Sequence, residues 1–326
     1  MTTDSRQHLI ISVPDDEPTV LARTHVEERL RRIGEVRIWD DRPLDPDTLV
    51  QRIGDADVVV NIRATSRFTF GVLKRCPRLK IISIYGVGVD NVDLKAASRL
   101  GITVCNTPGY SAVAVAEMAL ALALAVARRI VINDRSIRGG GWARGYGAQL
   151  HGKTLGVVGT GNIGQQMVRV GKGIGMKVIA WTFNASPERA REYGVEFVPL
   201  DDLLRQSDVV SLHLTMTPQS KGLIGARELA LMKPTAILVN TARGPMVDEA
   251  ALVQALQENR IAGAGIDVFD KEPLPEGHPL AELDNVVLSP HVAAMTPETT
   301  LGGLDMAVDN IEAFLSGRPT HVVNPL

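Results

Sequence analysis

Short apolar runs alternate with stretches of helical spacing along the first hundred residues. The runs at 9–13, 57–60 and 79–84 are apolar and partly β-branched, which predicts strands, whereas 18–33 has the periodicity of a helix. This alternation is typical of βαβ units, in which parallel strands form a sheet covered by helices. We therefore predict a small α/β domain with a flavodoxin-like parallel sheet.

The same alternation begins again after a long helical region at 111–137 and a glycine-rich segment at 138–141. Six strands are predicted in this second half, at 154–158, 177–181, 209–212, 236–240, 264–268 and 286–288. Six strands with helices between them form a complete doubly wound sheet. An amphipathic helix at 297–315 has no strand to follow it, so we expect it to fold back onto the first domain. The predicted domains are 1–107 plus 297–326, and 108–296, with the ligand in the crevice between them.

Composition and charge exclude several classes of partner. The chain has 326 residues, 45% of them hydrophobic, and 35 Lys and Arg against 37 Asp and Glu. A balance so near neutral favours neither nucleic acid nor an anionic membrane surface as a partner.

The most apolar helical run, at 118–127, is well short of the roughly 20 residues that cross a bilayer. Residues 1–6 lack a secretory signal, and Cys76 and Cys105 lack metal-ligand spacing. We predict a cytoplasmic protein without a metal.

A glycine-rich turn follows the first strand of the second half. The apolar run 155–158 ends in Gly159-Thr160-Gly161-Asn162-Ile163-Gly164 and passes into a helical stretch. A strand that feeds such a turn presents backbone N–H groups and the positive end of a helix to a pyrophosphate. The pattern alone is weak, and a packing turn is the alternative, but the strand before it and the helix after it favour a dinucleotide site. We expect Gly159, Gly161 and Gly164 to bind the phosphates.

The residue after the next strand affects the choice of dinucleotide. An acid is expected there to hold the adenosine ribose hydroxyls, but Thr182 occupies the position. Without that acid a 2′-phosphate is not repelled, yet no Arg or Lys follows immediately to bind one. Arg189 and Arg191 lie in the next predicted helix. Both NAD(H) and NADP(H) remain open, and NAD is favoured.

Three charged or titratable residues follow later strands of the same sheet. Arg243 follows one strand, Glu272 lies in the loop after the next, and His291 follows a third. Doubly wound sheets bind ligands at the carboxyl edge of their strands, so these side chains can meet there. A guanidinium at such a point can bind a carboxylate through two hydrogen bonds. Taken singly, each residue has an ordinary alternative: a surface cation, a solvated loop acid and a loop histidine.

Taken together, the motifs resemble those of the D-isomer-specific 2-hydroxyacid dehydrogenases, the family of phosphoglycerate dehydrogenase and glyoxylate/hydroxypyruvate reductase. They occur in family order over nearly the whole chain. The matching segments are Gly86-Val87-Gly88-Val89-Asp90, Asn106-Thr107-Pro108-Gly109, Val115-Ala116-Glu117, the glycine turn, Ser211-Leu212-His213-Leu214, Asn240-Thr241-Ala242-Arg243-Gly244, the segment from Gly265 to Pro273, and Ser289-Pro290-His291.

The resemblance implies a role for each of the three residues. Arg243 would bind the substrate carboxylate and polarise the 2-oxo group, His291 would be the acid and base, and Glu272 would hydrogen-bond to His291. A carboxylate beside an imidazole stabilises its protonated form, which can then donate a proton to the carbonyl oxygen as hydride arrives. The activity implied is reduction of a small 2-oxoacid, such as glyoxylate, hydroxypyruvate or a phosphoglycerate-like acid, to the D-2-hydroxyacid.

The same resemblance assigns residues to substrate and cofactor. Backbone N–H groups of Val87 and Gly88 would hold the substrate carboxylate, and Arg63 in the segment 61–65 would meet a substrate phosphate or hydroxyl unless it is a surface arginine. Asp267 would contact the nicotinamide carboxamide. His213 lies on a family motif, although a histidine in an apolar strand is often satisfied locally. The other predicted cofactor contacts are Asn162, Ile163, Thr182, Thr241, Ala242 and Arg243. Domain 108–296 would thus bind NAD(P), and the other domain the substrate.

Further expectations concern assembly and alternatives. The apolar helix at 112–126 and the segment 138–147, which contains Trp142, resemble the dimer-forming region of the family, so we predict a homodimer.

A formate dehydrogenase of the superfamily would carry Gln in place of Glu272. A dinucleotide-sensing corepressor on the same fold keeps the Arg, Glu and His, and is the alternative to an enzyme.

Overall fold

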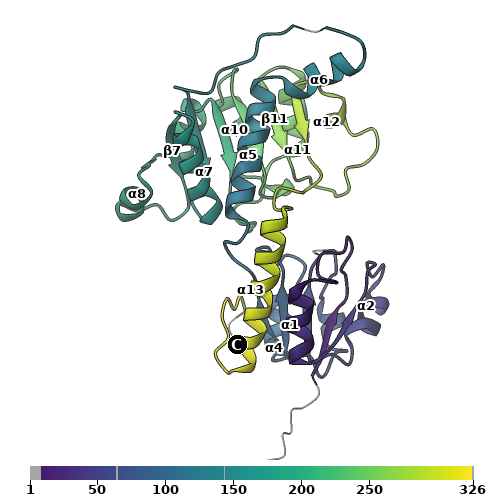
Figure 1. Cartoon of the computed structure of the whole chain (residues 1–326). Coiled ribbons are helices and arrows are strands. Elements are labelled where there is room, and N and C mark those ends of the chain that lie inside the picture. The colour runs from purple at the N-terminus through teal and green to yellow at the C-terminus, as the bar shows by residue number, and fades with distance from the viewer. Residues whose placement is uncertain (1–8, 64, 143, 325–326) are drawn as a thin grey trace, which may run out of the picture. The chain divides into compact units, whose positions relative to one another are not determined.

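The computed structural model describes residues 9–63, 65–142 and 144–324. The chain forms two compact units: unit 1 comprises Met1–Tyr110 and Thr296–Leu326, and unit 2 comprises Ser111–Met295 (Figure 1). The prediction about a secretory signal at 1–6 falls outside the described residues, as does Ala64 in the predicted substrate segment.

Among the described residues, unit 1 has a five-stranded parallel sheet in the order β2-β1-β3-β4-β5. This is the flavodoxin-like order, which confirms the predicted fold class. The strands are β1 (Ile10–Val13), β2 (Glu35–Ile38), β3 (Val58–Asn61), β4 (Ile81–Ile84) and β5 (Thr103–Cys105). The helices are α1 (His25–Ile33), α2 (Pro46–Ile53), α3 (Phe70–Leu73), α4 (Leu94–Arg99) and α13 (Pro297–Leu315).

The helix predicted at 18–33 begins later than expected. The carboxylate of buried Asp16 accepts hydrogen bonds from the backbone N–H groups of Val20, Leu21 and Ala22, which hold the segment before α1 in a turn. Helix α1 then begins at His25, where the Thr24 side chain accepts the Glu27 N–H. The prediction was wrong for residues 18–24 because a side chain competes for their backbone donors.

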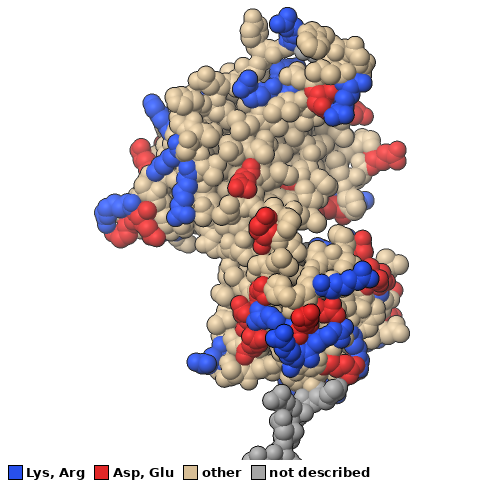
Figure 2. All heavy atoms as spheres, viewed as in Figure 1, with Lys and Arg blue, Asp and Glu red and all other residues tan. Residues whose placement is uncertain are grey.

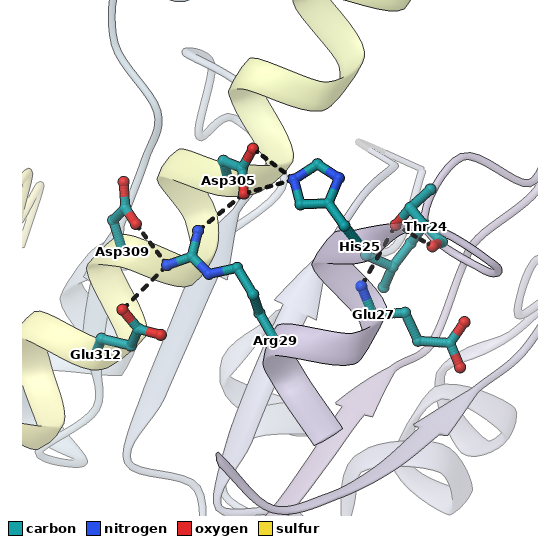
Figure 3. Close-up of polar contacts among 8 residues, drawn as sticks. Thr24, His25, Glu27, Arg29, Asp305, Asp309 and Glu312 are labelled. Carbon is teal, nitrogen blue, oxygen red and sulfur yellow. Dashed lines mark hydrogen bonds and ion pairs between the residues drawn. The ribbon is translucent and has the colours of Figure 1, made fainter. Parts of the chain in front are cut away.

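Helix α13 packs in unit 1 against α1 and β4 (Figure 1). Its residues Leu304, Val308 and Ile311 are buried in the core of that unit. Arg29 of α1 donates hydrogen bonds to three acids of α13, and His25 contacts one of them (Figure 3). The acids are Asp305, Asp309 and Glu312, at 2.8, 2.7 and 3.0 Å from Arg29. Acidic and basic side chains accordingly mix on this face of unit 1 (Figure 2).

In its described part, unit 2 has a seven-stranded parallel sheet in the order β12-β11-β10-β9-β6-β7-β8. This is the doubly wound order with one added strand, and the chain reverses direction across the sheet between β6 and β9. The strands are β6 (Thr154–Val158), β7 (Lys177–Trp181), β8 (Glu196–Phe197), β9 (Val209–Leu212), β10 (Ile237–Asn240), β11 (Gly263–Ile266) and β12 (Val286–Leu288). The buried apolar residues of unit 2 form two clusters, and each cluster contains residues from a different set of helices.

The helices of unit 2 are α5 (Ala112–Ala127), α6 (Ile130–Arg138), α7 (Asn162–Gly173), α8 (Pro187–Tyr193), α9 (Leu200–Gln206), α10 (Ala226–Leu231), α11 (Glu249–Gln257) and α12 (Pro279–Glu282), with a 3₁₀ turn, η1 (Gly244–Met246). Two details differ from prediction. The strand β8 was missed because two residues leave no periodic pattern. The helical region at 111–137 is two helices, because Arg129 has a left-handed backbone with φ of 53°.

Neither a membrane span nor a metal cluster is found in the described ranges. No helix there combines the length and apolar character that crossing a bilayer requires. Nor do those residues include a group of three or more His, Cys, Asp or Glu arranged to hold a metal ion.

Candidate active site

The predicted site residues of unit 2 gather at one edge of its sheet. They follow six strands closely, and the carboxyl ends of parallel strands lie at the same edge. The glycine turn follows β6, Thr182 follows β7, His213 follows β9, Thr241 to Arg243 follow β10, Asp267 follows β11, and His291 comes shortly after β12. This edge is where doubly wound sheets bind their ligands.

The glycine turn has the shape that a pyrophosphate requires. Gly159 has a φ of +96°, and a Cβ there would come within 2.8 Å of the backbone carbonyl of His213. A Cβ on Gly164 would collide with the carbonyl oxygen of Gly159, so glycine lets α7 start close to the strand. Gly161 caps α7 without a side-chain hydrogen bond and faces open space. The N-terminus of α7 therefore offers N–H groups to an anion.

Two polar atoms near this edge are buried without a hydrogen-bond partner among the described residues, the hydroxyl oxygen of Thr241 and Nδ1 of His213. A buried hydroxyl without a partner is costly, and a ligand hydrogen bond would satisfy Thr241. His213 is hydrogen-bonded locally through Nε2, which lies 2.8 Å from the Ser211 hydroxyl. Burial lowers the pKa of His213 to about 3, so its ring is neutral at physiological pH.

Glu272 and His291 form a hydrogen-bonded pair. Nδ1 of His291 lies 2.8 Å from Oε2 of Glu272, and Oε1 of Glu272 accepts the Phe269 N–H at 3.1 Å. Burial alone would raise the pKa of Glu272. The hydrogen bonds from His291 and Phe269, with the charges of His291 and Arg243, hold this pKa below its usual value instead. The charge of Arg243 contributes to this lowering of the Glu272 pKa.

The backbone around Arg243 is shaped by Asn240, to which the sequence had assigned no role. The Asn240 side chain accepts the Ala242 N–H at 3.0 Å and donates to the Arg243 carbonyl at 2.9 Å. A Cβ on Gly244 would collide with the backbone of Phe269, so the Arg243 turn packs directly on the loop that leads to Glu272. The signal available in the sequence was an asparagine at the end of an apolar run, and the structure shows that this asparagine is buried.

Asp267 is bound to the segment that carries His291. Its carboxylate is fully buried and accepts the N–H groups of Val292 and Ala293, both at 3.0 Å. Its backbone carbonyl accepts the His291 N–H at 2.8 Å. His291 itself has a left-handed backbone with φ of 55°, a conformation that neighbouring contacts must stabilise. Asp267 therefore shapes the turn that presents the imidazole.

The predicted substrate residues of unit 1 follow the neighbouring strands β3 and β4. The Arg63 guanidinium donates to the backbone carbonyls of Glu17 and Pro18, which anchor it. The carbonyl of Val87, next to Gly88, accepts the Asn106 side chain at 2.8 Å. These bonds hold both loops at the carboxyl edge of the sheet in unit 1.

Asp15, which the sequence did not single out, supports the first of these loops. Its buried carboxylate accepts the N–H groups of Ile62 and Arg63 at 3.0 and 3.2 Å, as well as the hydroxyl of Ser66. Burial raises the pKa of Asp15, although these hydrogen bonds oppose the shift. The segment beside Arg63 is therefore built around a buried acid.

Comparison with known proteins identifies the family. Residues 120–293 match the NAD-binding domain of the D-isomer-specific 2-hydroxyacid dehydrogenases. Glyoxylate reductase of Aeropyrum pernix is 44% identical over 308 residues, covering 91% of this chain and 92% of that protein. The chain belongs to the D-isomer-specific 2-hydroxyacid dehydrogenase family. As a 2-hydroxyacid dehydrogenase it is an NAD(P)-dependent oxidoreductase, and the resemblance found in its motifs is confirmed.

Solved structures of other proteins share the fold over nearly the whole chain. A glyoxylate reductase from Paecilomyes thermophila superimposes with a TM-score of 0.88 at 29% identity, covering 97% of this chain and 98% of that one. An acyclic imino acid reductase, solved in complex with NADPH and D-Arg, superimposes with a TM-score of 0.87 at 30% identity, covering 97% of this chain and 100% of that one.

Proposed function

We propose that this dehydrogenase reduces a small 2-oxoacid, glyoxylate or hydroxypyruvate, to the D-2-hydroxyacid. The observation that carries the proposal is the 2.8 Å contact between His291 and Glu272, whose loop packs against the turn that carries Arg243. The three residues supply an acid–base group in His291, a carboxylate in Glu272 that can stabilise a protonated imidazole, and a cation in Arg243 that can bind the substrate carboxylate. The glyoxylate reductase name of its Aeropyrum pernix relative supports the choice of substrate.

The three side chains divide the chemistry between them. When bound, the nicotinamide cofactor supplies the hydride that reduces the 2-oxo carbon. Arg243 binds the substrate carboxylate and polarises the carbonyl group. His291 is held through Nδ1 by Glu272, so its Nε2 donates the proton that the carbonyl oxygen takes up. In the oxidative direction, neutral Nε2 of His291 removes the proton from the hydroxyl group.

The coenzyme is assigned to the edge of the sheet in unit 2, within the proposed NAD(P)-binding domain 108–296. Gly159, Gly161 and Gly164, with the N–H groups of Asn162 and Ile163, would bind the pyrophosphate. The remaining proposed contacts are Thr182 at the ribose and Thr241, Ala242, Arg243 and Asp267 toward the nicotinamide. Two observations support this assignment: the open space at Gly161, and the Thr241 hydroxyl, which has no hydrogen-bond partner in the described part of the chain.

Several finer points stay predictions. The domain formed by 1–107 and 297–326 would bind substrate through Arg63, Val87 and Gly88. The sequence favoured NAD because no Arg or Lys directly follows Thr182, whereas the imino acid reductase of the same fold was solved with NADPH, so the choice between the two coenzymes stays open on these grounds. A homodimer and a cytoplasmic location also stay predictions, the former supported by exposed apolar side chains on and after α5 and α6, including Val113, Ile137 and Trp142.

The test is the initial rate of NADH and NADPH oxidation with glyoxylate, hydroxypyruvate, pyruvate and bulkier 2-oxoacids. The proposal predicts turnover with the small acids, fastest with glyoxylate or hydroxypyruvate, and a D-configured product where the product is chiral. Coenzyme binding without turnover of any 2-oxoacid would contradict it and would favour the dinucleotide-sensing alternative.

A further inference from the structure

Arg189 folds back from helix α8 onto the glycine turn. It lies in the first turn of α8, which Ser186 caps by accepting the Arg189 N–H. Its Nη1 donates to the Asn184 carbonyl at 2.7 Å, and its Nη2 lies 3.4 Å from both the carbonyl and the hydroxyl oxygen of Thr160. The guanidinium also lies 5.6 Å from the centre of the Tyr193 ring. These contacts hold a cation at a defined place.

That place borders the part of a dinucleotide site where the adenosine ribose is recognised. Thr160 lies between the first two glycines of the turn, and Asn184 lies two residues after Thr182 at the end of β7. In NAD-specific sites of this fold an acid at the end of this strand binds the ribose hydroxyls, whereas an arginine nearby accommodates a 2′-phosphate. The connection 182–186 contains no acid.

The nearest acid in the sequence does not occupy the position of the missing one. Glu188 is exposed, and its carboxylate lies 3.4 Å from the guanidinium of Arg191. Acidic and basic side chains lie together over α8, so the helix is not a general basic patch (Figure 2). A preference for phosphate at this place therefore depends on Arg189 itself.

We propose that Arg189 binds the 2′-phosphate of the coenzyme and that the enzyme prefers NADP(H) to NAD(H). The inference rests on the proposed function, because it assumes a dinucleotide on the glycine turn. The bonds from Nη2 to Thr160 are long, so the guanidinium can exchange them for a stronger charge-assisted bond to phosphate. This reverses the preference drawn from the sequence, which set Arg189 aside because it lies in the next helix and not directly after Thr182.

The experiment measures binding of adenine nucleotides without turnover. Isothermal titration compares 2′,5′-ADP with 5′-AMP, and NADPH with NADH, for the wild type, R189Q and R191Q. Arg191 is the matched control because it lies on the same helix and pairs with Glu188. A charged hydrogen bond of this kind predicts that the wild type binds the 2′-phosphorylated ligands about 10- to 100-fold more tightly, that R189Q loses this advantage, and that R191Q keeps it.

Each other outcome overturns the inference in a distinguishable way. Equal or weaker binding of 2′,5′-ADP by the wild type would refute it while leaving the proposed function intact. Equal losses in R189Q and R191Q would show general charge attraction rather than a specific contact. Binding of no nucleotide at all by the folded wild type would contradict the proposed function and the inference together.

Discussion

Oε2 of Glu272 lies 2.8 Å from Nδ1 of His291, while Oε1 of the same carboxylate accepts the Phe269 N–H. Because the carboxylate is held by its own loop, it fixes the orientation of the imidazole as well as supporting its charge. The other ring nitrogen, Nε2, takes no part in this contact, and it is the atom that we propose acts on the substrate. The pair joins two loops that follow different strands of the sheet.

Replacing Glu272 with Gln tests the electrostatic part of this pairing. The pKa of Glu272 lies below its ordinary value of 4.5, so the carboxylate is charged at neutral pH. Its negative charge is lost only as pH falls through the lowered pKa. E272Q removes the charge at every pH. We expect kcat/KM for 2-oxoacid reduction to be about 10-fold higher in the wild type than in E272Q at neutral pH, and this ratio to approach one only as pH falls through the lowered pKa of Glu272. A ratio near one at neutral pH would show that the charge does not matter.

Replacing Arg243 with Lys tests carboxylate recognition. Lysine keeps the charge but cannot form two parallel hydrogen bonds, so KM for the 2-oxoacid should rise by about 10- to 100-fold. R260K is a suitable control, because Arg260 is an exposed cation paired with Glu258. Steady-state kinetics with both variants would measure the effect. Similar KM values for R243K and the wild type would argue against the assigned contact.

Replacing Asp267 with Asn separates two functions of this residue. The amide can accept only one of the N–H groups of Val292 and Ala293, so the turn carrying His291 should loosen. An unsatisfied buried N–H costs about 1–3 kcal/mol, which predicts a lower melting temperature. If Asp267 positions His291, kcat falls while the dissociation constant of the coenzyme changes little. A weaker coenzyme affinity with unchanged kcat would instead indicate a contact with the nicotinamide.

Replacing Arg29 with Ala tests how α13 is attached to α1 within unit 1. The guanidinium bonds three acids of α13, and these are partly exposed, so the loss should be about 1 kcal/mol or less. Thermal unfolding should show a modestly lower midpoint, and the difference from wild type should shrink in high salt. R32A on the same helix is the control. A loss of thermal stability that does not depend on salt would indicate that Arg29 contributes through packing and not through its charge.

Much of the fold could be predicted from the local pattern of apolar and polar residues in the sequence. Buried parallel strands are continuous apolar runs, so most were located to within a residue or two, and their order placed Arg243, Glu272 and His291 at one edge. Strands β2, β5 and β8 were not located, because β2 alternates charged and apolar residues and β5 and β8 have only three and two residues. The break between α5 and α6 was missed because Arg129 is left-handed without being glycine.

The supporting contacts of the site could not be predicted in the same way. Asp267 bonds residues 25 and 26 positions further along the chain, and Asp15 bonds a loop more than 45 positions away. Such hydrogen bonds exist only once the sheets have formed. Arg189 was passed over for a related reason, since a helical turn returns it to a segment 29 residues earlier.

Reduction of glyoxylate by H291A, measured beside H278A, tests whether His291 is the acid and base of the reaction. His278 is also paired with an acid, Glu249 at 3.0 Å, but lies outside the group formed by Arg243, Glu272 and His291. We expect H291A to lower kcat by about 10²- to 10⁴-fold while coenzyme binding persists, and H278A to stay close to wild type. Wild-type turnover by folded H291A would contradict the proposed role of His291.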